Sequence, residues 1–217
     1  MAPARFVLVL SAALLLGACT TGPRPLPDDR ERAWDEARAQ LRALDGWRAE
    51  GRLAVRTPDD GAQAHFTWQE SADGRFALRL AGPWGQGAAR LVGGAGQARL
   101  DTGEGREYSG PDARELLFAV YGWDIPVAAL RRWLIGLPGD DAEYTLDRFG
   151  RVATLDWRDW SLEYRRYRQQ DGLDLPALLI ARRAADGVAL RMAVDSWQLG
   201  GQPAAVPDSP VPLMGGG

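Results

Sequence analysis

Residues 47–69 read WRAEGRLAVRTPDDGAQAHFTWQ, and this stretch decides the fold. Apolar or small residues alternate with polar ones over residues 47–55 and again over residues 62–69. Because a β-strand points successive side chains to opposite faces, both segments are predicted to be half-buried strands. The Pro58-Asp59-Asp60-Gly61 segment between them is typical of a tight turn. The short, closely spaced strands that follow predict an antiparallel meander.

The rest of the chain continues this pattern around a helical insert. Helical spacing of apolar residues predicts an N-terminal helix at Arg30–Leu44 and two inserted helices, at Asp112–Tyr121 and Pro126–Ile135. A one-layer sheet of about eleven strands must curl to bury its apolar face. The fold is therefore predicted to be mainly β, a curled antiparallel barrel with a helical lid and an N-terminal helix. The further strands are predicted at residues 76–80, 86–92, 97–102, 106–108, 143–147, 152–157, 160–167, 176–182 and 188–199.

The N-terminus has the pattern of an export signal. One positive charge precedes an apolar run from Phe6 to Leu16, which is too short to span a bilayer. The run ends in Leu16-Gly17-Ala18-Cys19, which resembles the lipobox of bacterial lipoproteins, where the cysteine receives a diacylglycerol and becomes the first mature residue. We therefore predict a lipoprotein signal peptide at residues 1–18 and lipidation at Cys19. The alternative is an ordinary signal peptide followed by an incidental cysteine.

The mature chain is predicted to contain one folded domain between two irregular segments. Residues 19–29 hold three prolines and show no periodicity, so they are predicted to form a flexible lipidated tether. Residues 30–199 form the predicted lidded β-barrel domain. Residues 200–217 are rich in proline and glycine and are predicted to be disordered.

The composition excludes several classes of function. The formal net charge at pH 7 is −3, so we expect no nucleic-acid partner. The chain has no lysine, which excludes a phosphate-loop lysine and Schiff-base chemistry. A single histidine and a single cysteine leave no multi-histidine or thiolate metal site. Since His65 lies in a predicted strand and no Gly-x-Ser-x-Gly occurs, a hydrolase using it is the weakest hypothesis. We predict no enzyme, no catalytic residue, no metal and no cofactor.

A curled sheet would turn the bulky side chains of its first three strands inward, under the two inserted helices. A curved barrel with such a cover can enclose an apolar ligand, although the alternation fits a barrel filled solid by these side chains almost equally well. The candidate lining of an acyl-chain cavity is Trp47, Leu53, Val55, Phe66, Trp68, Phe76, Leu78 and Leu80. The candidate lid residues are Leu116, Leu117, Val120, Leu130, Trp133 and Leu134.

Four short motifs follow one another along the predicted barrel. They are Gly51-Arg52-Leu53-Ala54, Phe66-Thr67-Trp68-Gln69, Gly82-Pro83-Trp84-Gly85 and Leu134-Ile135-Gly136-Leu137-Pro138-Gly139. The last is the most specific, together with the preceding Pro126, Val127, Leu130 and Trp133. In this order, behind a lipobox, they resemble the LolB family over about residues 47–199. The resemblance implies an unclosed antiparallel β-barrel of the LolA/LolB type, with a helical lid over an acyl-chain cavity.

The resemblance also implies a function and partners. LolB proteins take lipoproteins from the periplasmic carrier LolA and insert them into the outer membrane, without nucleotide hydrolysis. A soluble carrier of the same fold would not be lipidated, so Cys19 favours the receptor. We expect a monomer anchored by its lipid to the periplasmic face of the outer membrane. Its expected partners are a LolA-like carrier, the acyl chains of lipoproteins and the outer membrane.

One loop is assigned by the resemblance alone. LolB proteins share a protruding loop with an exposed apolar residue that engages the membrane, and here it corresponds to Gly82-Pro83-Trp84-Gly85. Trp84 stands where the better-known form of the family has leucine, and a tryptophan ring favours the lipid–water interface. The alternative is that Trp84 folds back onto the sheet edge. The alternative for the whole protein is an anchored structural or assembly lipoprotein with a solid barrel core and only protein partners.

Overall fold

One antiparallel sheet contains all the strands that the computed structural model describes, which it does for residues 27–82 and 88–200. The strand order is β6-β5-β4-β3-β2-β1-β11-β10-β9-β8-β7, so β1 and β11 join two meanders. Because β6 and β7 do not pair with each other, the barrel is open, and the predicted unclosed barrel of about eleven strands is confirmed. The strands are β1 (Gly46–Arg56), β2 (Gly61–Ser71), β3 (Phe76–Ala81), β4 (Ala89–Gly94), β5 (Gln97–Thr102), β6 (Glu107–Gly110), β7 (Glu143–Leu146), β8 (Val152–Trp157), β9 (Trp160–Gln170), β10 (Leu173–Arg183) and β11 (Val188–Leu199).

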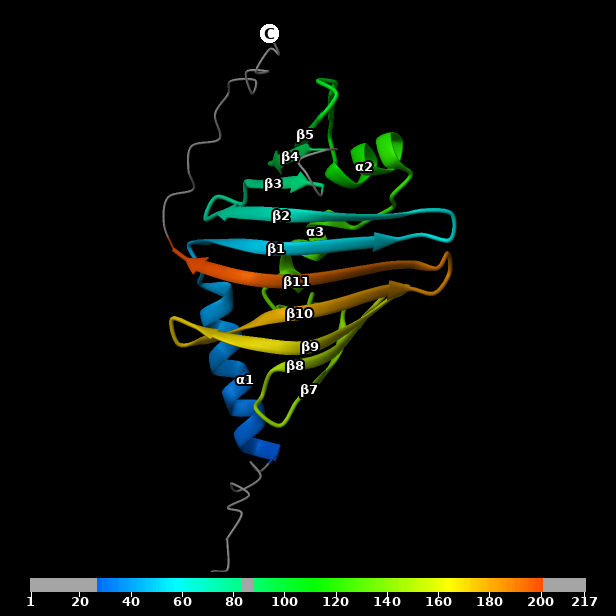
Figure 1. Ribbon diagram of the computed structural model, residues 1–217. Coiled ribbons are helices and arrows are strands. Elements are labelled where there is room, and N and C mark those ends of the chain that lie inside the picture. Colours follow the sequence, from blue (N-terminus) through cyan, green and yellow to red (C-terminus); the bar gives the residue numbers. More distant parts are fainter. Residues whose placement is uncertain (1–26, 83–87, 201–217) are drawn as a thin grey trace, which may run out of the picture.

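Three helices pack on the curved sheet, as Figure 1 shows. They are α1 (Pro27–Arg42), α2 (Ala113–Tyr121) and α3 (Val127–Leu134). The first begins three residues before the predicted start, so residues 27–29 of the predicted tether are helical. It begins at a proline, which suits the first turn of a helix because the missing N–H has no helical partner there. Within the described residues, none of the helices is long and apolar enough to cross a membrane.

Some strands are longer than predicted, because their backbone pairing continues beyond the alternation of apolar and polar residues. β9 and β10 extend to a tight turn at Asp171-Gly172, where both residues have positive φ angles. Alternation is lost after Tyr167 because the next three residues are all polar, but backbone pairing with β10 continues to Gln170. β4 begins at Ala89, and the predicted earlier start at residues 86–87 lies outside the described residues.

The backbone geometry explains why two positions in the motifs are glycine. Gly51 lies at a β-bulge between β1 and β11, where a Cβ atom would come within 2.0 Å of the Ala193 carbonyl oxygen. Gly136 has a φ of +77° and ends α3, donating its N–H to the Trp133 carbonyl at 2.9 Å. A side chain at the first position would collide with the neighbouring strand, and one at the second would be strained.

Candidate functional site

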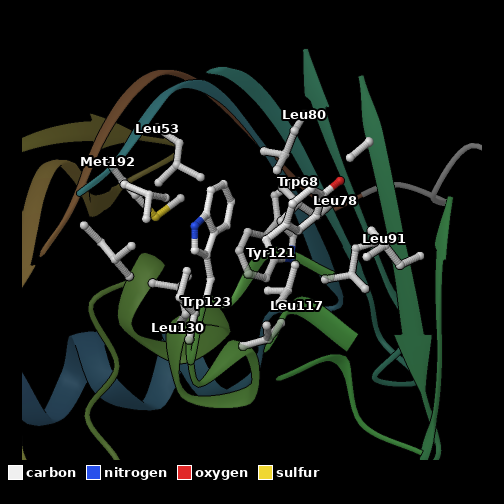
Figure 2. A pocket seen from close by; sticks show the side chains of 16 residues that line it. Leu53, Trp68, Leu78, Leu80, Leu91, Leu117, Tyr121, Trp123, Leu130 and Met192 are labelled. Carbon is white, nitrogen blue, oxygen red and sulfur yellow. The ribbon is translucent and has the colours of Figure 1, made fainter. Parts of the chain in front are cut away.

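An apolar pocket lies between the first strands of the sheet and the two inserted helices (Figure 2). All of its side chains are aliphatic or aromatic, and their only polar atoms are the Tyr121 hydroxyl and the indole nitrogens of Trp68 and Trp123. Such a surface suits a hydrocarbon ligand. The lining residues are Leu53, Val55, Trp68, Leu78, Leu80, Ala89, Leu91, Leu100, Leu117, Tyr121, Trp123, Ile125, Val127, Leu130, Leu190 and Met192.

The pocket is nearly closed in this conformation. Its free volume is about 30 Å³. One water molecule needs roughly 10–15 Å³ of such space, so the pocket has room for about two waters. A ligand much larger than this volume would fit only if α2, α3 and the sheet moved apart.

Five of the eight predicted cavity residues line this pocket, namely Leu53, Val55, Trp68, Leu78 and Leu80. The remaining three, Trp47, Phe66 and Phe76, are buried beside it. The Trp47 ring packs against the Trp68 and Trp197 rings, with centroids 6.2 and 5.5 Å away. The Arg131 guanidinium lies 4.8 Å from the Phe76 ring centroid, and Phe66 pairs with Gly51 across the sheet. Contact with an acyl chain stays a prediction for all eight.

Two of the six predicted lid residues face the pocket, and the other four do not. Leu117 of α2 and Leu130 of α3 face the pocket. Leu116 is buried without lining it, and Val120 is half-buried. Trp133 and Leu134 are fully buried on another side of α3, where the Trp133 ring packs against those of Trp157 and Trp160 at 5.6 and 6.0 Å.

Sequence reasoning left nine lining residues out of the cavity. The sequence pattern could have indicated several of them. Leu91 and Leu100 lie in predicted strands, and Leu190 and Met192 occupy alternate positions of the last strand. Tyr121 and Val127 lie on the apolar stripes of the predicted helices. By contrast, Trp123 and Ile125 lie in the connection between the helices, where no periodicity marks them. Ala89 is too small for its alternation to stand out.

α3 is fastened to the β2–β3 hairpin by a mostly buried ion pair. Arg131 Nε donates to Glu70 Oε2 at 2.9 Å, and Arg131 Nη2 donates to the Gly74 carbonyl at 2.7 Å. Burial raises the pKa of the Glu70 carboxyl, although the Arg131 guanidinium acts in the opposite direction. The pair therefore positions the helix, while its desolvation offsets much of its electrostatic gain.

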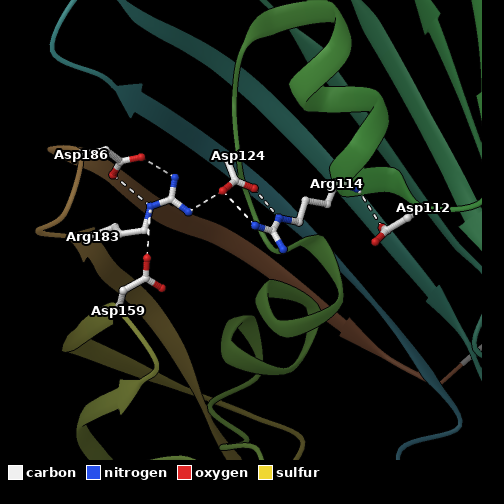
Figure 3. A network of polar contacts seen from close by, with 6 residues as sticks. All are labelled: Asp112, Arg114, Asp124, Asp159, Arg183 and Asp186. Atoms are coloured by element: carbon white, nitrogen blue, oxygen red, sulfur yellow. Dashed lines mark hydrogen bonds and ion pairs between the residues drawn. The ribbon is translucent and has the colours of Figure 1, made fainter.

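A second polar network fastens the connection between α2 and α3 to the C-terminal end of β10 (Figure 3). Asp124 Oδ2 accepts from Arg114 Nη2 of α2 and from Arg183 Nη1 at the end of β10, both at 2.9 Å. Arg183 is only 6% exposed and also donates to Asp186, with Asp159 3.7 Å away. Hydrogen bonds from Arg114 and then Arg183 hold the pKa of Asp124 at about 2. Both lid helices thus meet at a connection that is tied to the sheet.

The other predicted sites lie away from the pocket or outside the described residues. His65 is exposed on the face of β2 opposite to Trp68, so it points away from the pocket. Gly82 follows β3 and is half-buried. Cys19, Pro83, Trp84 and Gly85 lie outside the described residues.

Comparisons with known proteins agree with this architecture. A family model described as outer membrane lipoprotein LolB matches residues 45–197. The chain is similar to the outer-membrane lipoprotein LolB of Alkalilimnicola ehrlichii, with 39% identity covering 90% of this chain and 97% of that relative. It is 33% identical to the LolB of Pseudomonas fluorescens, covering 89% and 96% of the two chains. A LolA superfamily protein from Nitrosomonas europaea has a similar fold, with a TM-score of 0.52 at 10% identity over 81% of this chain and 95% of that one.

Proposed function

The chain belongs to the LolB family of outer-membrane lipoproteins, and from that premise we propose how it acts. It is a lipid-anchored protein of the outer membrane in the lipoprotein localisation pathway, and it is not an enzyme. As a monomer held by a lipid on Cys19, it accepts the acyl chains of lipoproteins from a LolA-like carrier. The chains enter the pocket beneath α2 and α3 and then pass into the outer membrane.

The observation that carries this proposal is the wholly apolar pocket under a helical cover. Leu80 at the end of β3 and Ala89 at the start of β4 both line it. The two strand ends that flank the Gly82-Pro83-Trp84-Gly85 motif in the sequence therefore lie at the pocket. That position supports a route from the pocket directly to the lipid surface. Trp84 would enter the lipid–water interface as a chain is released.

The energetics favour a passive relay. Exposing one 16-carbon chain to water costs on the order of 12 kcal/mol, at about 0.8 kcal/mol per CH₂ group. Cargo must therefore move along a continuous apolar route from carrier to pocket to bilayer. Because the empty pocket closes to about 30 Å³, holding a chain requires the lid to stay displaced. The bilayer carries no such cost, so release is downhill without nucleotide hydrolysis.

An anchored structural lipoprotein with a solid core and only protein partners is the alternative function. Family membership does not favour it. Uptake of a fluorescent fatty acid separates the two, because only an openable pocket would take up the probe and release it to a competing fatty acid. A Cys19→Ala protein is suited to this measurement. It should be soluble and folded, since the lipid serves to anchor the chain rather than to build the fold.

A transfer assay tests the proposal as a whole. Purified protein is mixed with lipoprotein-loaded carrier and liposomes, and cargo is followed from carrier to protein to lipid. The Trp84→Glu variant should keep its melting temperature, accept cargo and release it poorly, because a charge replaces the ring at the interface. Gln97→Glu adds the same charge at an exposed position of β5 and should transfer normally. Parental release by Trp84→Glu would remove the membrane-contact role, and no acceptance by the parent protein would remove the proposed function.

A further inference from the structure

The turn between β7 and β8, residues 147–151, holds an aromatic ring out in solvent. Phe149 is 51% exposed. Asp147 Oδ1 accepts from the backbone N–H groups of Phe149 and Arg151 at 2.8 and 3.0 Å, so the turn is shaped by bonds that do not involve the ring. The guanidinium groups of Arg148 and Arg151 lie 4.6 and 4.7 Å from the ring centroid.

Of the two arginines in this turn, only Arg148 has no carboxylate partner among the described residues. Arg151 is neutralised by Asp147 at 2.6 Å and Asp174 at 3.6 Å. Arg148 is exposed, and no carboxylate of the described residues lies within 4.0 Å of its nitrogens. An exposed aromatic ring beside a guanidinium that no carboxylate pairs with is a combination that suits the surface of a phospholipid bilayer, where apolar and anionic groups lie a few ångströms apart.

The turn lies against the end of α1 that is closest to the predicted lipid anchor. A Cβ atom on Gly150 would come within 2.6 Å of the Arg30 carbonyl oxygen and 3.0 Å of Ala33 Cβ, so the turn backbone touches the first two turns of α1. Figure 1 shows the β7–β8 turn beside this end of the helix. Pro27 follows Cys19 by eight residues, which can span at most about 28 Å.

We infer that the β7–β8 turn is a membrane-contact surface, with Phe149 in the lipid–water interface and Arg148 on phospholipid phosphates. The inference rests on lipidation of Cys19 and does not depend on the cargo pocket. The short tether keeps the turn at a high effective concentration near the bilayer, so a weak contact is sufficient. A second exposed ring, that of Phe118, is 60% exposed but does not belong to this surface. It lies on α2 against β4, β5 and β6, whereas β7 and β8 are at the opposite side of the sheet.

The test uses the full lipidated protein in vesicles of phosphatidylethanolamine and phosphatidylglycerol. Lipidation occupies the only native thiol, so a Thr145→Cys substitution, at an exposed position of β7 two residues before the turn, provides a unique site for an environment-sensitive fluorophore and keeps Arg148 and Phe149. Lipid-borne quenchers should quench this label. Adding Phe149→Ser should lower the ratio of docked to undocked protein roughly tenfold, because burial of one phenylalanine side chain is lost. A label at Gln97→Cys is the matched control and should stay unquenched, because Gln97 is exposed and pairs with Gly94 at the end of β4 that is farther from the Gly82-Pro83-Trp84-Gly85 motif.

Equal quenching at positions 97 and 145, or quenching at 145 that survives Phe149→Ser, would overturn the inference. A label change that needs no lipid and rises with protein concentration would assign the turn to a second copy of the chain, and it would overturn the inference as well. Fatty-acid uptake should be the same for parent and Phe149→Ser. If the parent takes up no fatty acid while the label is quenched, the cargo function fails and the membrane contact stands.

Discussion

The two lid helices are held in different ways. α3 buries four of its eight residues, and Trp133 and Leu134 among them are almost inaccessible. Its backbone is held as well, because the buried Tyr164 hydroxyl donates to the Trp133 carbonyl at 2.9 Å. α2 buries three of its nine residues and leaves Phe118 60% and Tyr121 37% exposed. It rests on the outer strands of the sheet, including the four-residue edge strand β6.

This difference indicates which helix moves when the pocket opens. Displacing α2 exposes Leu117 and Tyr121 of the pocket together with Ala113 and Leu116, whereas displacing α3 would break the Trp133 cluster and the Arg131–Glu70 pair. Segments with few buried contacts open at the lowest free energy. We therefore expect α2 to be the gate and α3 to be part of the fixed wall. The bonds of Asp124 hold the connection between them and make it the natural hinge.

The largest effect is expected from removing the anchor of α3. Trp133→Ala should lower the free energy of unfolding by about 3–5 kcal/mol, as large-to-small substitutions of a packed aromatic ring do. Denaturant unfolding of the two variants Trp133→Ala and Trp123→Ala measures the contrast. Trp123 is only partly buried and lines the pocket, so its loss should cost less and should not weaken fatty-acid uptake. Similar costs for both would mean that the connection is as firmly packed as α3.

A charge on the inner face of α2 should separate ligand binding from folding. Leu117→Glu should abolish most fatty-acid uptake while lowering the free energy of unfolding by only about 1–3 kcal/mol, because α2 can swing out and hydrate the carboxylate. Phe118→Glu places the same charge on the outer face of the same helix and should leave both quantities near parental values. Fluorescence titration and thermal melting measure the two quantities. If Leu117→Glu loses stability as severely as Trp133→Ala, α2 is ordinary core and not a gate.

The smallest effect is expected at the hinge, and it should depend on pH. The pKa of Asp124 is about 2 in the folded protein against an ordinary value of 3.8, so its bonds stabilise the fold at neutral pH and this contribution is lost as pH falls from about 4 to 2. Asp124→Asn should therefore cost at most about 2 kcal/mol at pH 7 and almost nothing near pH 2. Amide exchange in α2 should become faster than in the parent. Asp195→Asn, in an exposed pair with Arg52, is the control and should change neither. An equal cost at both pH values would exclude the ion pairs as its source.

Much of the fold follows from local patterns. Alternation along the strands predicted a curled sheet of about eleven strands, because a half-buried sheet needs an apolar and a polar face in every strand, and the family resemblance implied that the barrel is unclosed. The helical spacing of apolar residues predicted both inserted helices to within one residue at each end. The motifs around Gly51 and Gly136 indicated the family, and both glycines mark backbone positions that a side chain would disturb.

The membership of the pocket was decided by tertiary structure. Leu53 faces Met192 only because β1 pairs with β11, and no local pattern specifies that pairing of distant segments. Trp133 belongs to the same apolar stripe as Leu130, but α3 is covered on two sides, so one residue meets the pocket and the other meets Trp157 and Trp160. By itself the sequence determined the strands, the helices and the family, because periodicity and backbone sterics act over a few residues. Which apolar side chains enclose the pocket, and which helix can leave it, depended on packing between segments far apart in the chain.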